Sequence, residues 1–198
     1  MPVFYAFSDT VMDRWEFAHK YVENFLRWYT AFRLRNPDVL SAEKLPPAEL
    51  PDFVRAQIRE TGYFPYALNT YAGLLDRTMT LPEERALRLP RNVADHDEST
   101  IVVFLDEFQN TRLPQYKFDI VGLFQETVES LTCPHFITGS AMSILAREIL
   151  GRGALFGRFR YRPIKPFTEY WGAELALKAA AYHGADLPEV MAPVVANR

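Results

Sequence analysis

The stretch IVVFLDEFQN, residues 101–110, constrains the fold more than any other part of the chain. Five apolar residues, three of them β-branched, run directly into the carboxylates Asp106 and Glu107. Such a run is typical of a strand buried on both faces, in a parallel sheet that carries helices on either side. Ligands of these sheets bind outside the carboxyl ends of the strands, so we expect both carboxylates at the ligand-binding edge. A helix-capping role is the alternative for an acidic residue at this place.

Apolar runs alternate with helical patterns on both sides of this stretch. Further strands are predicted at residues 3–7, 135–138 and 160–164, and helices at residues 11–35, 52–60, 66–79, 82–89, 116–131, 141–150 and 167–182. Strands that alternate with helices predict an α/β fold with a mostly parallel sheet flanked by helices. Residues 1–184 form the predicted domain, and residues 185–198 are interpreted as a tail or the start of a further segment.

Two polar stretches are interpreted as loops. Residues 37–52 carry four prolines, which disfavour regular structure. Residues 91–100 contain the sequence Asp-His-Asp-Glu, which has the composition of a metal site. They precede the strand, however, and so belong to the edge opposite the expected ligand-binding edge. A solvated loop is the preferred interpretation.

Composition narrows the functional classes. The net charge of −3 does not indicate nucleic acid, and no apolar segment is long enough to span a membrane. The single cysteine, Cys133, has no partner for an internal disulfide, which fits a reducing cytoplasm. No sequence motif for serine, cysteine or zinc catalysis occurs. We therefore expect a cytoplasmic protein with no membrane partner.

A series of short motifs resembles one known family. The order LDEFQ, ITGS, LFGRF and IKPFTEYW, within residues 101–171, resembles the archaeal-type ATPases, which are AAA+-related P-loop ATPases. The resemblance implies that the chain binds ATP and Mg²⁺ and belongs to a class that hydrolyses ATP. It places Mg²⁺ on Asp106 and makes Glu107 the residue that activates the attacking water, as in a Walker B strand.

The same resemblance assigns further site residues. Gln109 and Thr138 would lie near the γ-phosphate, and so would Ser140, which is preferred to Thr138 as the sensor. Arg158 resembles the family's arginine that stabilises transition-state charge. The alternatives for these residues stay open: a loop role for Gln109, a helix cap for Ser140 and a surface position for Arg158.

The phosphate-binding loop of the family is absent from the sequence. No glycine among the nine is followed by Lys-Ser or Lys-Thr, so no G-x-x-x-x-G-K-[ST] motif occurs. The first predicted strand, residues 3–7, resembles the second strand of the family's domain. We therefore interpret the chain as a P-loop ATPase core that lacks its first strand, phosphate loop and first helix, and we expect it to be inactive alone.

Two other functional classes remain at this stage. Arg147, Arg152, Arg158, Arg160, Arg162 and Lys165 form a basic region at 147–165 with aromatic residues between them, which is compatible with contacts to nucleic acid phosphates. The missing loop is also compatible with a non-catalytic scaffold or interaction remnant of an ATPase. Such a protein would act through a homo-oligomer or a regulatory partner.

Overall fold

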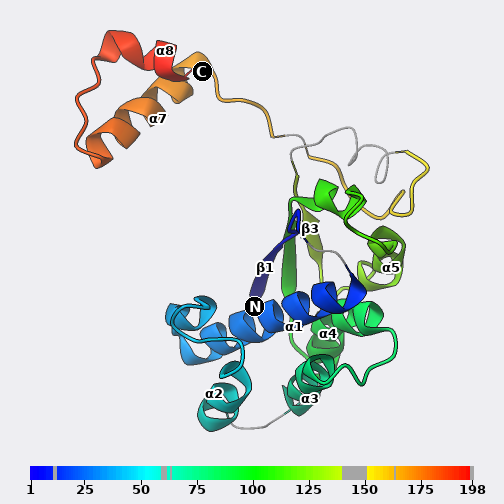
Figure 1. Ribbon diagram of the computed structural model, residues 1–198. Helices are drawn as coiled ribbons and strands as arrows, with labels where there is room; N and C mark the ends of the chain where they lie inside the picture. Colours follow the sequence, from blue (N-terminus) through cyan, green and yellow to red (C-terminus); the bar gives the residue numbers. More distant parts are fainter. Residues whose placement is uncertain (11–12, 59–61, 63, 140–150, 163, 197–198) are drawn as a thin grey trace. The chain divides into compact units, whose positions relative to one another are not determined.

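The structure is a computed structural model that describes all residues except 11–12, 59–61, 63, 140–150, 163 and 197–198 (Figure 1). The chain divides into two compact units, Met1–Arg160 and Tyr161–Arg198. The helix predicted at 141–150 lies outside the described residues. In this division, the last long helix belongs to the second unit and the sheet to the first. The sequence interpretation placed this helix in the same domain as the sheet.

Among the described residues, the first unit contains a parallel sheet of three strands, β1 (Pro2–Ala6), β2 (Val102–Asp106) and β3 (His135–Ile137), in the order β1-β2-β3 (Figure 1). Phe4 lies opposite Phe104, which lies opposite Phe136. The prediction that residues 101–105 and 135–138 form neighbouring parallel strands is confirmed. An α/β fold with a parallel sheet is likewise confirmed.

One face of the sheet carries the hydrophobic core. Alternation along the strands sends Val3, Tyr5, Val103 and Leu105 to this face, and all four are buried. The helical layer of the unit comprises α1 (Arg14–Leu34), η1 (Pro37–Leu40), α2 (Leu50–Gln57), α3 (Phe64–Leu75), α4 (Pro82–His96), η2 (Phe108–Arg112) and α5 (Ile120–Thr127). Aromatic rings of α1 and α5 pack on the strands: Phe17 and Tyr21 meet Tyr5, and Phe124 meets His135.

The long helix α1 begins at a side-chain cap and ends at a left-handed residue. Asp13 Oδ1 accepts hydrogen bonds from the amides of Trp15 and Glu16, both at 2.8 Å. Arg35 closes the helix at φ 51°. The helix predicted at 11–35 is confirmed, and its aromatic residues Phe17, Tyr21 and Phe25 are buried in the core.

A buried arginine fastens the proline-rich segment to α1. Arg27 is 4% exposed and pairs with Glu23 at 2.8 Å. Its remaining nitrogens donate to the carbonyl oxygens of Val39 at 2.9 Å and Leu45 at 2.8 Å. Each of the three guanidinium nitrogens therefore has an acceptor, as a buried charge requires. The segment predicted as a loop also contains η1 and the start of α2.

Four predictions about local structure are wrong. Residues 160–162 and 164 form no strand, because a strand needs a neighbour for its ladder and the described part of the sheet ends at β3. The segment 91–96 is helix, since α4 continues through Pro90 to His96. The strands are not buried on both faces as predicted, because Val102 and Phe104 of β2 are only half-buried and Phe136 of β3 is 54% exposed. The predicted helix 116–131 is also shorter, and only Ile120–Thr127 is α-helical.

The second unit is a small helical pair. It contains α7 (Glu169–Tyr182), η4 (Glu189–Met191) and α8 (Ala192–Ala196). Thr168 caps α7 by accepting a hydrogen bond from the amide of Trp171 at 3.5 Å. A Cβ at Gly172 would lie 3.0 Å from the Cβ of Ala196, so glycine permits the close approach of α7 and α8. In the described part of the chain, no helix has both the length and the apolar character to cross a membrane.

Candidate functional site

The carboxyl ends of the strands bring Asp106 and Thr138 together. The Thr138 amide donates to the Leu105 carbonyl at 2.8 Å, which continues the ladder beyond β3. This places the Thr138 hydroxyl beside Asp106, and it donates to Asp106 Oδ1 at 2.5 Å. The same oxygen accepts the amide of Glu107 at 2.9 Å. Asp106 is exposed, and its orientation is set by two donors on one oxygen.

Glu107 leaves the sheet in a left-handed conformation. Its backbone lies at φ 52° and ψ 38°, a region that costs a residue other than glycine about 1 kcal/mol or more. Strain of this kind persists where the surroundings fix the chain, and here Phe108 donates to the Thr138 carbonyl at 3.2 Å. The turn holds the Glu107 carboxylate in solvent, where it accepts a hydrogen bond from Gln109 Nε2. Asp106, Glu107, Gln109 and Thr138 thus form one group, here called the Asp106 cluster.

Two residues that the sequence interpretation missed, Asn110 and Tyr116, support this edge. Asn110 Nδ2 donates to the Phe7 carbonyl at 2.8 Å, and the Tyr116 hydroxyl donates to the Ser8 carbonyl at 2.8 Å. Both hydrogen bonds connect the residues that directly follow β1 to the segment that follows β2. Burial raises the pKa of Tyr116, so its hydroxyl keeps the proton that it donates. No sequence pattern reports these contacts, because they join residues more than 100 positions apart.

The two remaining predicted site residues lie elsewhere or outside the described residues. Arg158 Nε pairs with Glu129 at 3.0 Å, and Arg158 Nη1 donates to the Ala154 carbonyl at 3.4 Å. Glu129 belongs to the segment between α5 and β3, which enters the sheet at its amino edge. Ser140 lies outside the described residues. The assignments of Arg158 and Ser140 therefore stay predictions.

The oxygen ligands of the Asp106 cluster suit Mg²⁺, because Mg²⁺ needs only a few ligands from the protein. They do not suit a metal ion that is held entirely by protein side chains. Within the described residues, no group of three or more His, Cys, Asp or Glu side chains is placed to hold a metal ion. Mg²⁺ keeps several waters and binds through one or two carboxylates together with substrate phosphates. One oriented carboxylate, Asp106, beside one hydroxyl, Thr138, matches that donor set.

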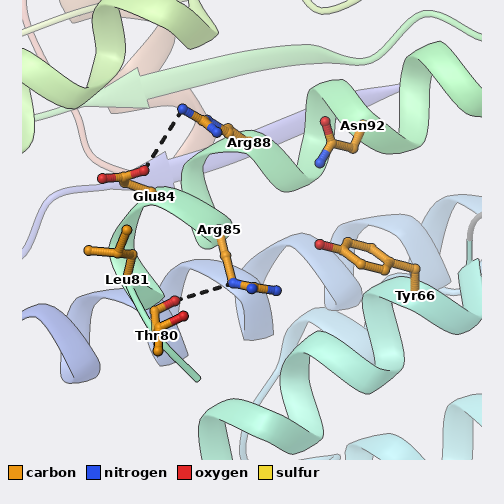
Figure 2. A pocket seen from close by; sticks show the side chains of 7 residues that line it. All are labelled: Tyr66, Thr80, Leu81, Glu84, Arg85, Arg88 and Asn92. Atoms are coloured by element: carbon orange, nitrogen blue, oxygen red, sulfur yellow. Dashed lines mark hydrogen bonds and ion pairs between the residues drawn. The ribbon is translucent and has the colours of Figure 1, made fainter. Parts of the chain in front are cut away.

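A polar pocket separate from the Asp106 cluster lies between α3 and α4. It measures about 290 Å³ and is lined by Tyr66, Thr80, Leu81, Glu84, Arg85, Arg88 and Asn92 (Figure 2). Its arginines are engaged: Arg85 donates to the Thr80 carbonyl at 3.2 Å, and Arg88 pairs with Glu84 and Glu126. No member of the Asp106 cluster lines this hollow. It offers no carboxylate pair for metal or water chemistry.

Comparison with solved structures identifies the class of fold. A Walker-type ATPase of Pyrococcus abyssi superposes with a TM-score of 0.54 at 15% sequence identity, over 99% of this chain and 51% of that chain. The chain thus spans about half the length of that protein. No protein-family model and no curated protein matches the sequence. The α/β fold of this chain is accordingly similar to that of a Walker-type ATPase.

Proposed function

We propose that this chain supplies the Mg²⁺-binding and water-positioning half of an ATPase-like module. The observation that carries the proposal is the Asp106–Thr138 hydrogen bond across neighbouring parallel strands, with Glu107 exposed directly beside it. Asp106 would hold Mg²⁺, and Glu107 would accept the proton of the attacking water. When bound, Mg²⁺ neutralises phosphate charge. Gln109 keeps Glu107 in place, and Thr138 keeps Asp106 in place.

The phosphate-binding half must come from outside these 198 residues. Backbone amides and a lysine make most phosphate contacts in this class, and the sequence contains no such loop. Two carboxylates without those donors repel a polyphosphate. The chain alone is therefore expected to bind ATP only very weakly and to release no phosphate above background. This corresponds to a core that lacks its first strand and phosphate loop.

Metal binding tests the proposal without requiring activity. Mn²⁺ replaces Mg²⁺ on oxygen ligands and is followed by its paramagnetic effect on water relaxation. We expect weak binding that falls several-fold in Asp106→Asn. The matched control is Asp76→Asn, which removes one exposed carboxylate at the end of α3. Equal loss of Mn²⁺ binding in both variants would overturn the metal assignment.

Activity is tested on a chain completed with a phosphate loop. Fused to a strand, loop and helix of that type, the protein should hydrolyse ATP. Glu107→Gln should then abolish turnover and leave nucleotide binding largely intact, because the amide cannot take the water's proton. Arg158→Ala tests the expected charge-stabilising role: loss of turnover at unchanged binding would support it, and unchanged turnover would mean that Arg158 serves only its ion pair with Glu129. Full turnover in Glu107→Gln would refute the role of Glu107.

The nucleic acid alternative loses its structural argument. Its basic region, 147–165, includes the predicted strand at 160–164, on which alternate arginines would share one face, and the described part of that segment is not a strand. Arg158 is neutralised by Glu129. The observations therefore favour the ATPase-like proposal.

A further inference from the structure

The polar pocket between α3 and α4, here called the α4 pocket, contains an arginine that the protein leaves without a counter-charge. Arg88 pairs with Glu84, one helical turn before it, and the third arginine of α4 likewise has an acidic partner at this spacing. No acidic residue stands three or four positions before or after Arg85 in the sequence. Accordingly, Arg85 forms no ion pair in the described part of the chain.

One hydrogen bond fixes the direction of the Arg85 guanidinium group. Arg85 Nε donates to the Thr80 carbonyl at 3.2 Å. The two terminal nitrogens, Nη1 and Nη2, have no acceptor among the described residues. In Figure 2 the Arg85 guanidinium group and the Tyr66 hydroxyl point toward one another across the pocket. A planar pair of N–H donors held in this way matches two oxygens of a carboxylate or of a phosphate.

Two further polar side chains of the pocket are available to a ligand. The side-chain amide of Asn92, which is half-buried, and the hydroxyl of Thr80 form no hydrogen bond with another described residue. An amide and a hydroxyl can each donate and accept, so both suit a neutral polar group such as a hydroxyl. Leu81, 51% exposed, and the ring of Tyr66 add apolar surface to the same pocket.

The charge balance of the pocket favours one negative charge on the ligand. Glu84 and Arg88 both line the pocket and offset each other, and Glu126 also pairs with Arg88. Only the positive charge of Arg85 is left, and a monocarboxylate complements it. A phosphate dianion, in contrast, would bring a second negative charge near two carboxylates. The volume of about 290 Å³ lies at the lower end of the range for ligand sites, about 300–1,000 Å³, and so selects a small molecule.

We propose that the α4 pocket binds a small hydroxycarboxylate, which is a monocarboxylate with a hydroxyl group on a short aliphatic chain. The carboxylate accepts hydrogen bonds from Nη1 and Nη2 of Arg85. The hydroxyl group bonds to the side-chain amide of Asn92, and the aliphatic chain packs against Leu81 and the ring of Tyr66. No member of the Asp106 cluster lines this pocket, so binding there does not depend on the function proposed for that cluster.

The probe is β-hydroxybutyrate, titrated into the full chain at constant ionic strength and followed by the amide NMR shifts of residues 80–92. Two analogues separate the contacts: β-hydroxybutyramide keeps the shape but has no charge, and butyrate keeps the charge but has no hydroxyl group. We expect saturable binding of β-hydroxybutyrate. The amide should bind at least about tenfold more weakly, because the charge-assisted pair of hydrogen bonds is lost. Butyrate should bind several-fold more weakly, because Asn92 loses its partner.

Substitutions in the pocket test the same contacts from the side of the protein. Arg85→Gln should weaken β-hydroxybutyrate binding at least about tenfold, and Arg85→Lys, which keeps the charge but not the paired donors, should weaken it several-fold. Asn92→Ala should weaken binding of β-hydroxybutyrate and leave that of butyrate unchanged, a difference that a purely structural role would not produce. Arg55→Gln is the control, because it makes the same change of charge at an exposed position on α2.

Each outcome decides the matter. Absence of saturable binding to the full chain overturns the proposal. Binding that Arg85→Gln leaves unchanged also overturns it, provided that the amide spectrum of this variant shows the native fold. Equal binding of β-hydroxybutyrate and its amide would show that the charge of Arg85 does not select the ligand, and would overturn it too. Tighter binding of inorganic phosphate than of β-hydroxybutyrate, at the same pocket residues, would assign the pocket to phosphate and overturn the carboxylate class.

Discussion

Acid should destabilise this protein through His135 at the start of β3. Its ring lies edge-on to Phe124, with centroids 6.5 Å apart, and burial lowers its pKa from 6.5 to about 4. The folded state therefore keeps His135 neutral at a pH where the unfolded state protonates it. Because the unfolded state binds more protons between pH 4 and 6.5, the free energy of unfolding falls as the pH falls through that window.

The size of the effect follows from the two pKa values. With 6.5 for the unfolded chain and about 4 for the folded chain, proton binding removes about 2 kcal/mol of stability between pH 7.5 and pH 5. The loss approaches about 3 kcal/mol below pH 4. Burial also lowers the pKa of His19, which adds a loss of the same sign. The contribution of His135 must therefore be isolated by substitution.

Urea unfolding between pH 5 and 7.5 provides the measurement. His135→Gln removes the titrating group, so its stability should change by about 2 kcal/mol less than that of the wild type over this range. His183→Gln is the control, because this exposed histidine keeps its contact with water on folding. We expect His183→Gln to follow the wild-type pH dependence. Parallel pH profiles for wild type and His135→Gln would refute the argument that burial holds His135 neutral.

Three further predictions concern stability. Arg27→Ala should cost about 3 kcal/mol in urea unfolding, because Glu23 keeps a partly buried charge and two carbonyl oxygens lose their donor; a loss below about 1 kcal/mol would contradict the stabilising role of Arg27. Glu107→Gly should raise the melting temperature by relieving about 1 kcal/mol of left-handed strain, and Glu107→Ala, which keeps the strain, should not. Asp13→Ala should cost about 1 kcal/mol through the lost cap of α1, and an unchanged midpoint would show that the cap contributes nothing.

Sequence reasoning correctly predicted those parts of the fold and site that depend on a short stretch of neighbouring residues. The apolar run before Asp106 defines β2 by itself, and Thr138 follows a second run, so their meeting at one edge follows from parallel pairing. The left-handed turn at Glu107 could not be predicted, since tertiary contacts impose it on a residue that disfavours it. The strand expected at 160–164 failed for a related reason: alternation is local, but strand formation needs a partner edge.

The separation between β1 and β2 has a consequence for synthesis of the protein. Pro2 pairs with Val102, so 100 further residues must be synthesised before β2, the strand that pairs with β1, emerges from the ribosome. At a translation rate of about 5–20 residues per second, that delay is about 5–20 s. Throughout it, Phe4 and the backbone of β1 are available to any other strand in the cell. Early capture of this segment by a chaperone, or by β1 of another nascent chain on the same polysome, would therefore govern the yield of folded protein.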